Sequence, residues 1–369
     1  MRCTWIYYND SVASVGGRWS SDTASVRYRL LIPVQALQGL GHEIDLVNVG
    51  TDTTFDAIDP VAGDVIVLSK IFVPSMDDFA AVSALSLQLV RAAKARGQRV
   101  VADMSDHHFD HQVYGAYFRT LVQEADLVVA STSSMADSVR QHTASPVHVI
   151  SDPYEGIRQP ARFTAPTRRG GRLVSQVFRT VIGAGRTPRR LHLLWFGHGT
   201  NLDTLVGLVP DLMRLAGRYA LELQVVTASK TGADRLCEEL DRAYAPLCRF
   251  SFSEWSVETT QQALRDCDVV VIPSRSNDTG KAVKSPNRMI ESVWAGRYVA
   301  AHPVPSYREF APYSYVGDDI VKGIEAAVAA PRRTRRKIEA GQRHIAEHYA
   351  PAAIGRQWEA VLTSAAGGA

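Results

Sequence analysis

Residues 281–296, which read KAVKSPNRMIESVWAG, hold the clearest chemical pattern in this chain. They follow a short apolar run at residues 269–272 that predicts a buried strand. Ser285 is a favourable N-cap, Pro286 suits the first helical position, and Gly296 is typical of a helix end. The pattern therefore predicts a helix that begins close to the exit of a buried strand.

Charged residues flank the start of this predicted helix. Lys281 and Lys284 lie just before it. Glu291 lies one turn inside, four residues after Asn287 and on the same face. Free backbone N–H groups, the helix dipole and two ammonium groups attract an anion, and a nearby carboxylate can accept hydrogen bonds from sugar hydroxyls. We expect this segment to bind a nucleoside diphosphate, the alternative being a solvated lysine loop before an ordinary amphipathic helix.

Length and composition limit the class of protein. The chain has 369 residues, which favours two domains, and its formal net charge of +3 gives no indication of nucleic acid binding. Its four cysteines lack metal-type pairing and suit buried thiols in a reducing compartment. The N-terminus lacks the apolar core of a secretion signal, and no window approaches a membrane-spanning length. We therefore expect a cytoplasmic protein.

Strand-like and helix-like segments alternate in two halves of similar size. The expected strands are residues 3–8, 43–47, 64–69, 99–103, 127–130, 147–150, 191–196, 222–227, 247–252, 269–272 and 298–301. The expected helices are residues 25–39, 77–96, 114–124, 134–141, 201–216, 232–243, 257–266, 286–295 and 318–348. Short buried strands that alternate with helices predict parallel sheets covered on both faces. The predicted fold class is α/β, with two Rossmann-like domains facing an interdomain cleft.

Domain boundaries are expected where turn-forming residues interrupt this alternation. Residues 1–155 form the predicted N-terminal domain and residues 156–350 the second domain. Residues 158–190 are basic and rich in Gly, Pro and Thr, which predicts a linker or an insertion, with a short helix near residues 173–182. A final helix is expected at residues 351–366. Ligands of such sheets bind outside the carboxyl ends of the strands, so the loops there are the candidate contacts.

Two loops of the first domain carry chemically suggestive residues. Gly16 and Gly17 follow the first strand and would let the backbone approach a ligand, unless they form only a flexible turn. Asp106 and His107 follow the strand at residues 99–103. Their spacing is poor for zinc, so hydrogen bonds to a polyol substrate are the better interpretation, against a helix cap with exposed histidines.

The second domain offers a glycine loop at its first strand. Gly197 and His198 begin a Gly-His-Gly turn before a helix, but Leu202 stands where a dinucleotide fingerprint has its third glycine. No acid ends the following strand either, which argues against NAD. The loop can still offer N–H groups to a phosphate, and a simple tight turn explains the glycines equally well.

Four further features lie on loops or helices of the second half. Trp255 could stack on a nucleobase or close the core. Arg275 follows a predicted strand and could reach the same phosphate as the lysines, and Lys230 lies in another loop after a strand. The basic run from Arg332 to Lys337 is either a solvated helix face or a contact with an anionic membrane.

At the level of the whole chain, these features resemble the two-domain GT-B glycosyltransferases. The strand, the loop and the Lys-x-x-Lys-Ser-Pro-Asn-x-x-x-Glu helix ending in Ala-Gly are similar to the large retaining, nucleotide-sugar-dependent branch, glycosyltransferase family 4 or group 1. The Gly-His before the second strand, Gly41 and His42, is also similar to that branch. The likeness spans almost the whole chain, although only residues 269–301 are specific.

The resemblance implies particular roles. Glu291 would contact the donor ribose, Lys284 with Ser285 and Asn287 would hold the diphosphate, and Gly16 or Gly17 would close over the donor. The Asp106–His107 loop would touch the transferred sugar. These roles make Lys284, Asp106 and His107 the expected catalytic residues. The helix at residues 351–366 would cross back to the first domain.

Two departures from the family pattern stand out. The family usually has a second glutamate eight positions before Glu291, where this chain has Val283. It also usually has an Arg and a Lys after the first strand of the second domain, where this chain offers His198 and Asn201. Phosphate neutralisation would then shift to other cations, namely Lys281, Lys284, Arg275 or Lys230.

The sequence therefore predicts a metal-independent hexosyltransferase with no cofactor, which uses a nucleotide-diphosphate sugar and retains configuration. The acceptor is open. One alternative is a sugar-nucleotide epimerase on the same fold, for which Asp103 and Asp106 are the candidate acids. A non-catalytic nucleotide-sugar binding protein is the other alternative.

Overall fold

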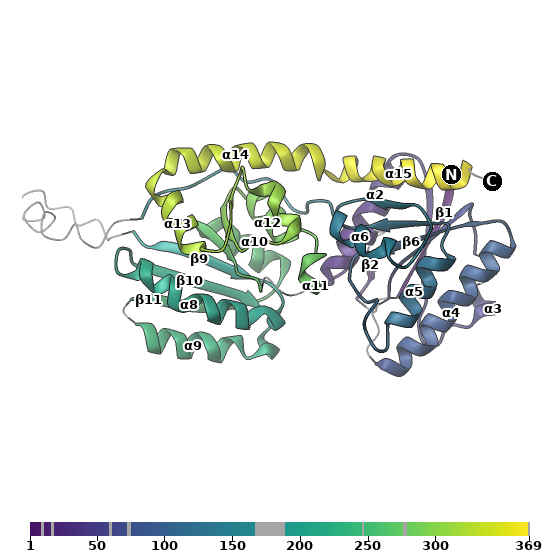
Figure 1. The fold of residues 1–369 in the computed structure, drawn as a ribbon, viewed down its shortest axis with the longest axis horizontal. Helices are drawn as coiled ribbons and strands as arrows, with labels where there is room; N and C mark the ends of the chain where they lie inside the picture. Colours follow the sequence, from purple (N-terminus) through teal and green to yellow (C-terminus); the bar gives the residue numbers. More distant parts are fainter. Residues whose placement is uncertain are drawn as a thin grey trace, which may run out of the picture. The chain divides into compact units, whose positions relative to one another are not determined.

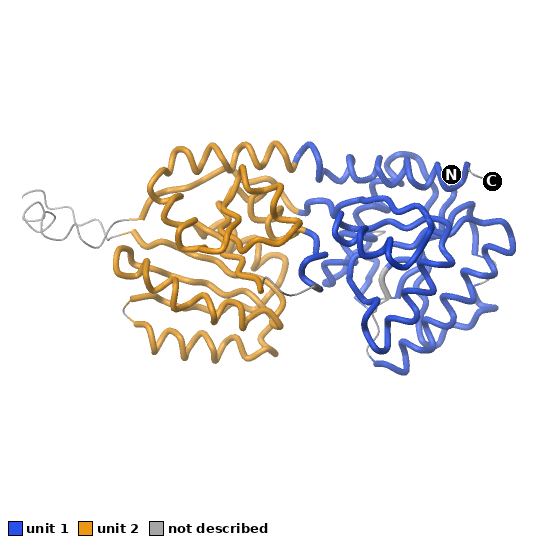
Figure 2. The backbone as a smooth tube through the Cα atoms, in the orientation of Figure 1, with its two compact units in different colours: residues 1–155, 279–285, 346–369 blue, residues 156–278, 286–345 orange. Residues whose placement is uncertain are grey.

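The computed structural model describes residues 1–8, 11–15, 18–58, 61–71, 75–166, 189–245, 247–275 and 279–367. They form two compact units, shown in different colours in Figure 2. Unit 1 comprises residues 1–155, 279–285 and 346–369, and unit 2 comprises residues 156–278 and 286–345. The chain therefore passes from one unit to the other more than once.

Unit 1 is built on a six-stranded sheet in the order β4-β1-β5-β6-β7-β8, in which every pair of neighbours is parallel. Strands β1 and β6 are labelled in Figure 1. Its strands are β1 (Arg2–Tyr8), β4 (Glu43–Asn48), β5 (Val65–Ile71), β6 (Arg99–Met104), β7 (Leu127–Ala130) and β8 (Val147–Val149). A hairpin of β2 (Ala13–Val15) and β3 (Arg18–Ser20) stands where the sequence suggested only a loop.

The helices of unit 1 include a π-helical segment that the sequence does not predict. The helices are α1 (Ala24–Val26), the π-helix η1 (Arg27–Leu31), α2 (Ile32–Gly39), α3 (Phe55–Ile58), α4 (Met76–Ala95), α5 (Gly115–Glu124), α6 (Ser133–Arg140), α11 (Thr279–Ala282) and α15 (Pro351–Gly367). In η1, Tyr28, Arg29, Leu30 and Leu31 are all buried. The wider turn of a π-helix is often found at functional or strained positions.

The core of unit 1 lies on both faces of its sheet. Because side chains alternate along a strand, Trp5 of β1 belongs to one cluster and Ile6 to the other. The C-terminal helix α15 completes the first cluster, where Trp358 lies 4.8 Å from Trp5 between ring centroids. Gly355 allows this close packing, since a Cβ there would lie 2.6 Å from the Cβ of Ala36.

Unit 2 has a sheet in the order β11-β10-β9-β12-β13-β14, again with parallel neighbours throughout. Its strands are β9 (Leu191–Phe196), β10 (Leu221–Thr227), β11 (Cys248–Glu254), β12 (Val269–Ile272), β13 (Tyr298–Ala301) and β14 (Tyr315–Val316). This is the strand order of dinucleotide-binding folds, and the order reverses between β9 and β12. The loops after those two strands are therefore the expected ligand contacts.

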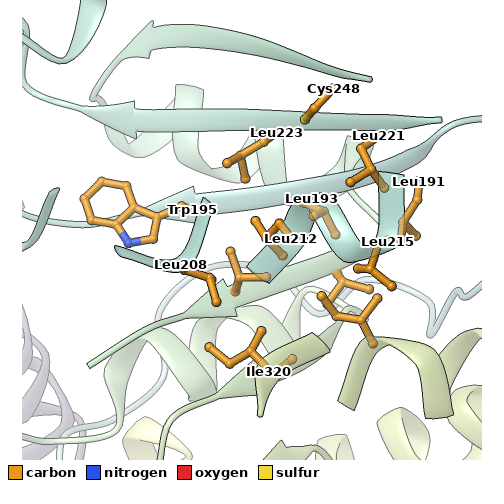
Figure 3. Packing of buried hydrophobic residues seen from close by; sticks show 14 of the residues in the cluster. Leu191, Leu193, Trp195, Leu208, Leu212, Leu215, Leu221, Leu223, Cys248 and Ile320 are labelled. Atoms are coloured by element: carbon orange, nitrogen blue, oxygen red, sulfur yellow. The ribbon is translucent and has the colours of Figure 1, made fainter. Parts of the chain in front are cut away.

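Helices cover the sheet of unit 2. They are α8 (Leu202–Ala216), α9 (Ala233–Tyr244), α10 (Val257–Asp266), α12 (Asn287–Trp294), α13 (Ile320–Ala329) and α14 (Pro331–His348), with the short 3-10 turns η3 (Gly199–Asn201), η4 (Ser229–Thr231) and η5 (Pro305–Phe310). Figure 3 shows Leu193 and Trp195 of β9 beside Leu208 and Leu212 of α8, with Ile320 of α13 nearby. Burying such side chains contributes about 1.5–3 kcal/mol each.

The structure differs from the expected division of the chain in two segments, because residues 279–285 and residues 346–350 both belong to unit 1. Residues 279–285 belong to unit 1, although the sequence places them in the second domain. The reason is packing: Val283 is buried in a core cluster of unit 1, and its carbonyl oxygen accepts a hydrogen bond of 2.8 Å from Thr132 Oγ1. Thr132 is also the N-cap of α6, so one side chain joins residues 279–285 to the start of that helix.

The structure gives more detail for the expected helical region at residues 318–348 and for the expected linker at residues 158–190. The helical region at residues 318–348 is two helices, because Pro331 cannot continue α13 and instead begins α14. Of the proposed linker at residues 158–190, residues 158–166 and 189–190 belong to unit 2. The remainder, including the short helix suggested near residues 173–182, lies outside the described residues.

The four cysteines are buried, as expected, and this gives a direct test of the fold. Burial raises the pKa of Cys3, Cys248 and Cys267 to about 12 and that of Cys237 to about 11. The thiolate is the reactive form. We therefore expect no thiol of the native chain to react quickly with a disulfide reagent at pH 8, whereas all four should react after denaturation. One fast thiol in the native chain would contradict this packing.

Candidate functional site

The candidate site of unit 2 lies at the carboxyl edge of its sheet. The loop after β9 begins with Gly197, and the loop after β12 begins with Pro273. These two loops flank the point where the strand order reverses, which is where ligands of such sheets bind. Thr227 ends the neighbouring strand β10 there, with a side-chain hydroxyl that is buried and has no hydrogen-bond partner among the described residues.

Close packing explains the two glycines of the β9 loop. Gly197 has a φ of +155°, and a Cβ there would lie 3.3 Å from Nη1 of Arg288. At Gly199 a Cβ would lie 2.0 Å from the methyl carbon of Thr231, so only glycine fits. His198 accepts a hydrogen bond of 3.3 Å from the backbone N–H of Thr200 through Nδ1. Its ring therefore stabilises the turn itself.

Arg288 is the residue of this site that the sequence interpretation missed. It lies in the first turn of α12, and its Nη1 donates a hydrogen bond of 3.4 Å to the backbone carbonyl of Phe196 at the end of β9. Within the described part of the chain, no carboxylate pairs with it. A guanidinium thus stands beside the loop after β9, which carries His198.

One signal in the sequence could have identified Arg288. The expected arginine after the first strand of the second domain is absent, and Arg288 lies one position after Asn287 in the predicted donor helix. A cation missing from one loop can be supplied by the neighbouring helix when both meet at one sheet edge. The distance in sequence between Gly197 and Arg288 hides this pairing.

The helix α12 begins slightly later than the sequence suggests. Its first residue is Asn287, Pro286 is the N-cap, and no side chain caps it, so the prediction that Ser285 is the N-cap is wrong. The carbonyl of Pro286 accepts the first helical hydrogen bond, from Ile290 at 2.9 Å. Glu291 is half-buried one turn after Asn287. The first N–H groups of this eight-residue helix precede its first hydrogen-bonded turn, and Glu291 lies one turn further on.

The remaining candidates of unit 2 have different surroundings. Arg275 is exposed and forms an ion pair with Asp203 in the first turn of α8, so a carboxylate already compensates its charge. Lys230 is exposed on the turn after β10. Trp255 is half-buried directly after β11, where its backbone N–H donates to the Thr227 carbonyl at 3.1 Å. Because Trp255 is not fully buried, it stays a candidate for stacking on a base.

Unit 1 holds the expected catalytic residues Lys284 and Asp106, and it brings their side chains into an ion pair. Lys284 is 57% exposed while Asp106 is only 13% exposed, so the ammonium group lies at the surface. Lys281 is in α11, in the same segment, and its carbonyl accepts from the Lys284 N–H at 3.2 Å. These lysines therefore belong to unit 1, and not to the unit that carries Glu291 and Arg288.

His107 lies beside this ion pair in the loop after β6. Its Nε2 is 3.7 Å from Asp110 Oδ2, and its ring meets Phe109 edge to face at 5.7 Å between centroids. Among the described residues, no group of three or more His, Cys, Asp or Glu side chains is arranged to hold a metal ion. Gly16 and Gly17, the other candidates of this unit, lie outside the described residues.

Asp103 belongs to a buried charge cluster. The Arg29 guanidinium forms ion pairs with Asp103 and Asp152, and Ser69 Oγ donates to Asp103 at 3.3 Å. Burial by itself would lower the pKa of Arg29, but the two carboxylates outweigh it and hold that pKa above its ordinary value. Arg29 is therefore charged, and the Asp103 carboxylate is paired with it. The acid that an epimerase would need at this position is thus already engaged.

Comparisons with known proteins find similar folds among solved structures. No protein-family model and no curated protein sequence matches the chain. Solved structures do match over nearly its whole length. Anabaena HepE in complex with UDP and glucose aligns with a TM-score of 0.64 and 12% identity, covering 99% of this chain and 100% of that one. A glycosyltransferase from Rickettsia africae aligns with a TM-score of 0.64 and 10% identity, covering 99% of this chain and 98% of that one.

A third structure is AviGT4, a glycosyltransferase involved in avilamycin A biosynthesis. It aligns with a TM-score of 0.57 and 13% identity, covering 99% of this chain and 98% of that one. The two six-stranded parallel sheets and the surrounding helices define the GT-B fold, which confirms the fold class expected from the sequence. Among the described residues, no helix combines the length and apolar character needed to cross a bilayer.

Proposed function

We propose that this chain is a glycosyltransferase that moves a hexose from a nucleotide-diphosphate sugar to an acceptor. The observation that carries the proposal is the guanidinium of Arg288, which has no carboxylate partner among the described residues. It stands beside the β9 loop and the N-terminus of α12, at the point where the strand order reverses. HepE was solved with UDP, with UDP and glucose, and with UDP-glucose, which supports a uridine nucleotide as the donor to test first.

The residues of unit 2 suit a diphosphate and a ribose. Arg288 and the backbone N–H groups at the start of α12 would bind the phosphates, and Glu291 would accept hydrogen bonds from the ribose hydroxyls. Trp255 would contact the base. On unit 1, Lys284 and the Asp106–His107 loop would contact the transferred sugar. Each of these side chains has the charge or the hydrogen-bonding groups that its part of the ligand requires.

The mechanism follows from where charge develops. The bond between the sugar's anomeric carbon and the phosphate oxygen breaks, and negative charge grows on the departing diphosphate. Preformed donors near that charge lower the barrier because they interact more strongly with the transition state than with the ground state. The acceptor oxygen bonds to the anomeric carbon, and its proton passes to an oxygen of the departing phosphate. Retention of configuration follows if both events occur on one face of the sugar.

A donor panel with matched variants tests this proposal. We expect the chain to bind one uridine-diphosphate sugar and to transfer its hexose to an acceptor from a broad panel. Glu291→Ala should weaken nucleotide binding by about 10- to 100-fold, since it removes hydrogen bonds to a charged acceptor. Glu238→Ala, which changes an exposed acid of α9 in the same unit, is the control and should bind as the parent does. Calorimetric titration with UDP measures both.

Other outcomes separate the alternatives. If the chain converts one sugar nucleotide into another without any acceptor, it is an epimerase, and the transferase proposal is overturned. Tight donor binding without turnover on the acceptor panel would indicate a non-catalytic binding protein. Equal UDP affinity in Glu291→Ala and the parent would remove the proposed role of Glu291. Equal affinity for the intact sugar nucleotide in Lys284→Ala and the parent would remove that of Lys284.

A further inference from the structure

Unit 2 contains a basic cavity at the opposite end of α12 from the candidate site. The cavity of about 540 Å³ lies between residues 158–161 and helix α14. It is beside the end of α12, because the Trp294 carbonyl at that end accepts from Gln159 N–H at 3.2 Å and from Gln342 Nε2 at 3.0 Å. Eight helical residues rise about 12 Å, so α12 separates this cavity from the Arg288 site at its beginning.

Three arginines face this cavity against a single carboxylate. Arg158, Arg335 and Arg343 line it, and Glu339 is the only acid among the lining residues. Glu339 already pairs with Arg335 at 3.0 Å, one helical turn away. Within the described part of the chain, neither Arg158 nor Arg343 has a carboxylate partner. Two guanidinium charges therefore remain uncompensated at one hollow.

Neutral groups hold one of these guanidinium groups in place. Nε and Nη2 of Arg158 each lie 3.2 Å from Oε1 of Gln342, and the guanidinium lies over the ring of Trp294, 5.8 Å from its centroid. Gln342 is 1% exposed, and its Nε2 also donates to the Gln159 carbonyl at 2.7 Å. Since this support comes from an amide and an aromatic ring, it fixes the position of Arg158 without neutralising its charge. The N–H groups not used by Gln342 remain available.

We propose that this cavity binds a phosphate group. Arginine forks match the oxygens of phosphate, and a fork fixed in advance loses less entropy on binding. The volume is in the range of pockets for small molecules, so the phosphate would be carried by a ligand of the size of a sugar phosphate or a lipid headgroup.

Titration with inorganic pyrophosphate, with excess UDP present to occupy the nucleotide site, tests this proposal. We expect saturable binding by the full chain and a loss of affinity of at least about tenfold in Arg158→Gln/Arg343→Gln. Arg332→Gln/Arg336→Gln is the matched control, because it removes two arginines from the exposed surface of α14 that do not line the cavity. It should change the affinity by less than about threefold at moderate salt.

A vesicle arm distinguishes the two sources of phosphate. If the ligand is a lipid headgroup, vesicles of phosphatidylcholine with phosphatidylglycerol should sediment the parent and the control, but not Arg158→Gln/Arg343→Gln. Binding of pyrophosphate without vesicle binding would indicate a free phosphate compound. No saturable pyrophosphate binding, or equal losses in the two double variants, would overturn the proposal. Arg343→Gln alone keeps the test valid if loss of Arg158 disturbs folding, since Arg343 is exposed.

Discussion

Replacing Arg29 by methionine should destabilise unit 1 by about 3–5 kcal/mol, the usual cost of removing one partner from a buried ion pair. Arg29 is 1% exposed, and its loss leaves the carboxylates of Asp103 and Asp152 buried near each other without a counter-charge. Arg29 Nη1 also donates to the Ile150 carbonyl at 2.6 Å, so a backbone acceptor would lose its partner too. Hydrogen exchange of the amides in β1 and β6 measures the effect within unit 1.

The control for this prediction is an arginine with the same kind of partner at the surface. Arg2 pairs with Asp45 at 2.9 Å, but its side chain is 52% exposed. Arg2→Met should therefore cost only about 0–1 kcal/mol. The triple variant Arg29→Met/Asp103→Asn/Asp152→Asn should recover part of the loss, because it leaves no buried charge. Equal exchange rates in Arg29→Met and Arg2→Met would show that the buried cluster does not stabilise unit 1.

Much of the fold could be predicted from the sequence because buried parallel strands leave a simple pattern. The residue ranges expected for β9, β12 and β13 are the observed ones, since each is a short apolar run bounded by polar or turn-forming residues. The ends of helices are harder to predict from the sequence than the ends of these strands. A shift of one or two residues at the start of α12 moves the cap from Ser285 to Pro286.

The candidate site was less predictable, because its members depend on tertiary packing. Val283 stands where the family resemblance implies a glutamate, but its apolar side chain also indicates a buried position, and in the structure it packs in the core of unit 1. Lys281 and Lys284 lie in the same segment as Val283, so they belong to unit 1 as well. Arg288 reaches the β9 loop only because β9 and β12 are neighbours in the sheet, which local sequence does not reveal.

Sugar transfer should depend most strongly on Arg288. If Arg288 stabilises the charge on the departing diphosphate, Arg288→Ala should lower kcat by about 10²- to 10³-fold, as removal of one such donor does in other enzymes. KM should change less, because the interaction strengthens as charge develops. Steady-state kinetics with the donor selected by the panel, together with UDP titration, measures the two effects separately. Arg288→Lys keeps the charge but loses the planar fork, so its kcat should lie in between.

Two further variants decide whether position as well as charge matters at Arg288. Gly197→Ala keeps the arginine, but its Cβ would lie 3.3 Å from Nη1 at a φ of +155° that favours glycine, so the guanidinium must move. We expect its kcat to fall by about tenfold or more, because misplacing a donor weakens transition-state contacts. Arg235→Ala removes an exposed arginine of α9 and should leave kcat unchanged. If Arg288→Ala and Arg235→Ala turn over equally fast, the leaving phosphate is stabilised elsewhere, and Arg288 only supports the β9 loop through the Phe196 carbonyl.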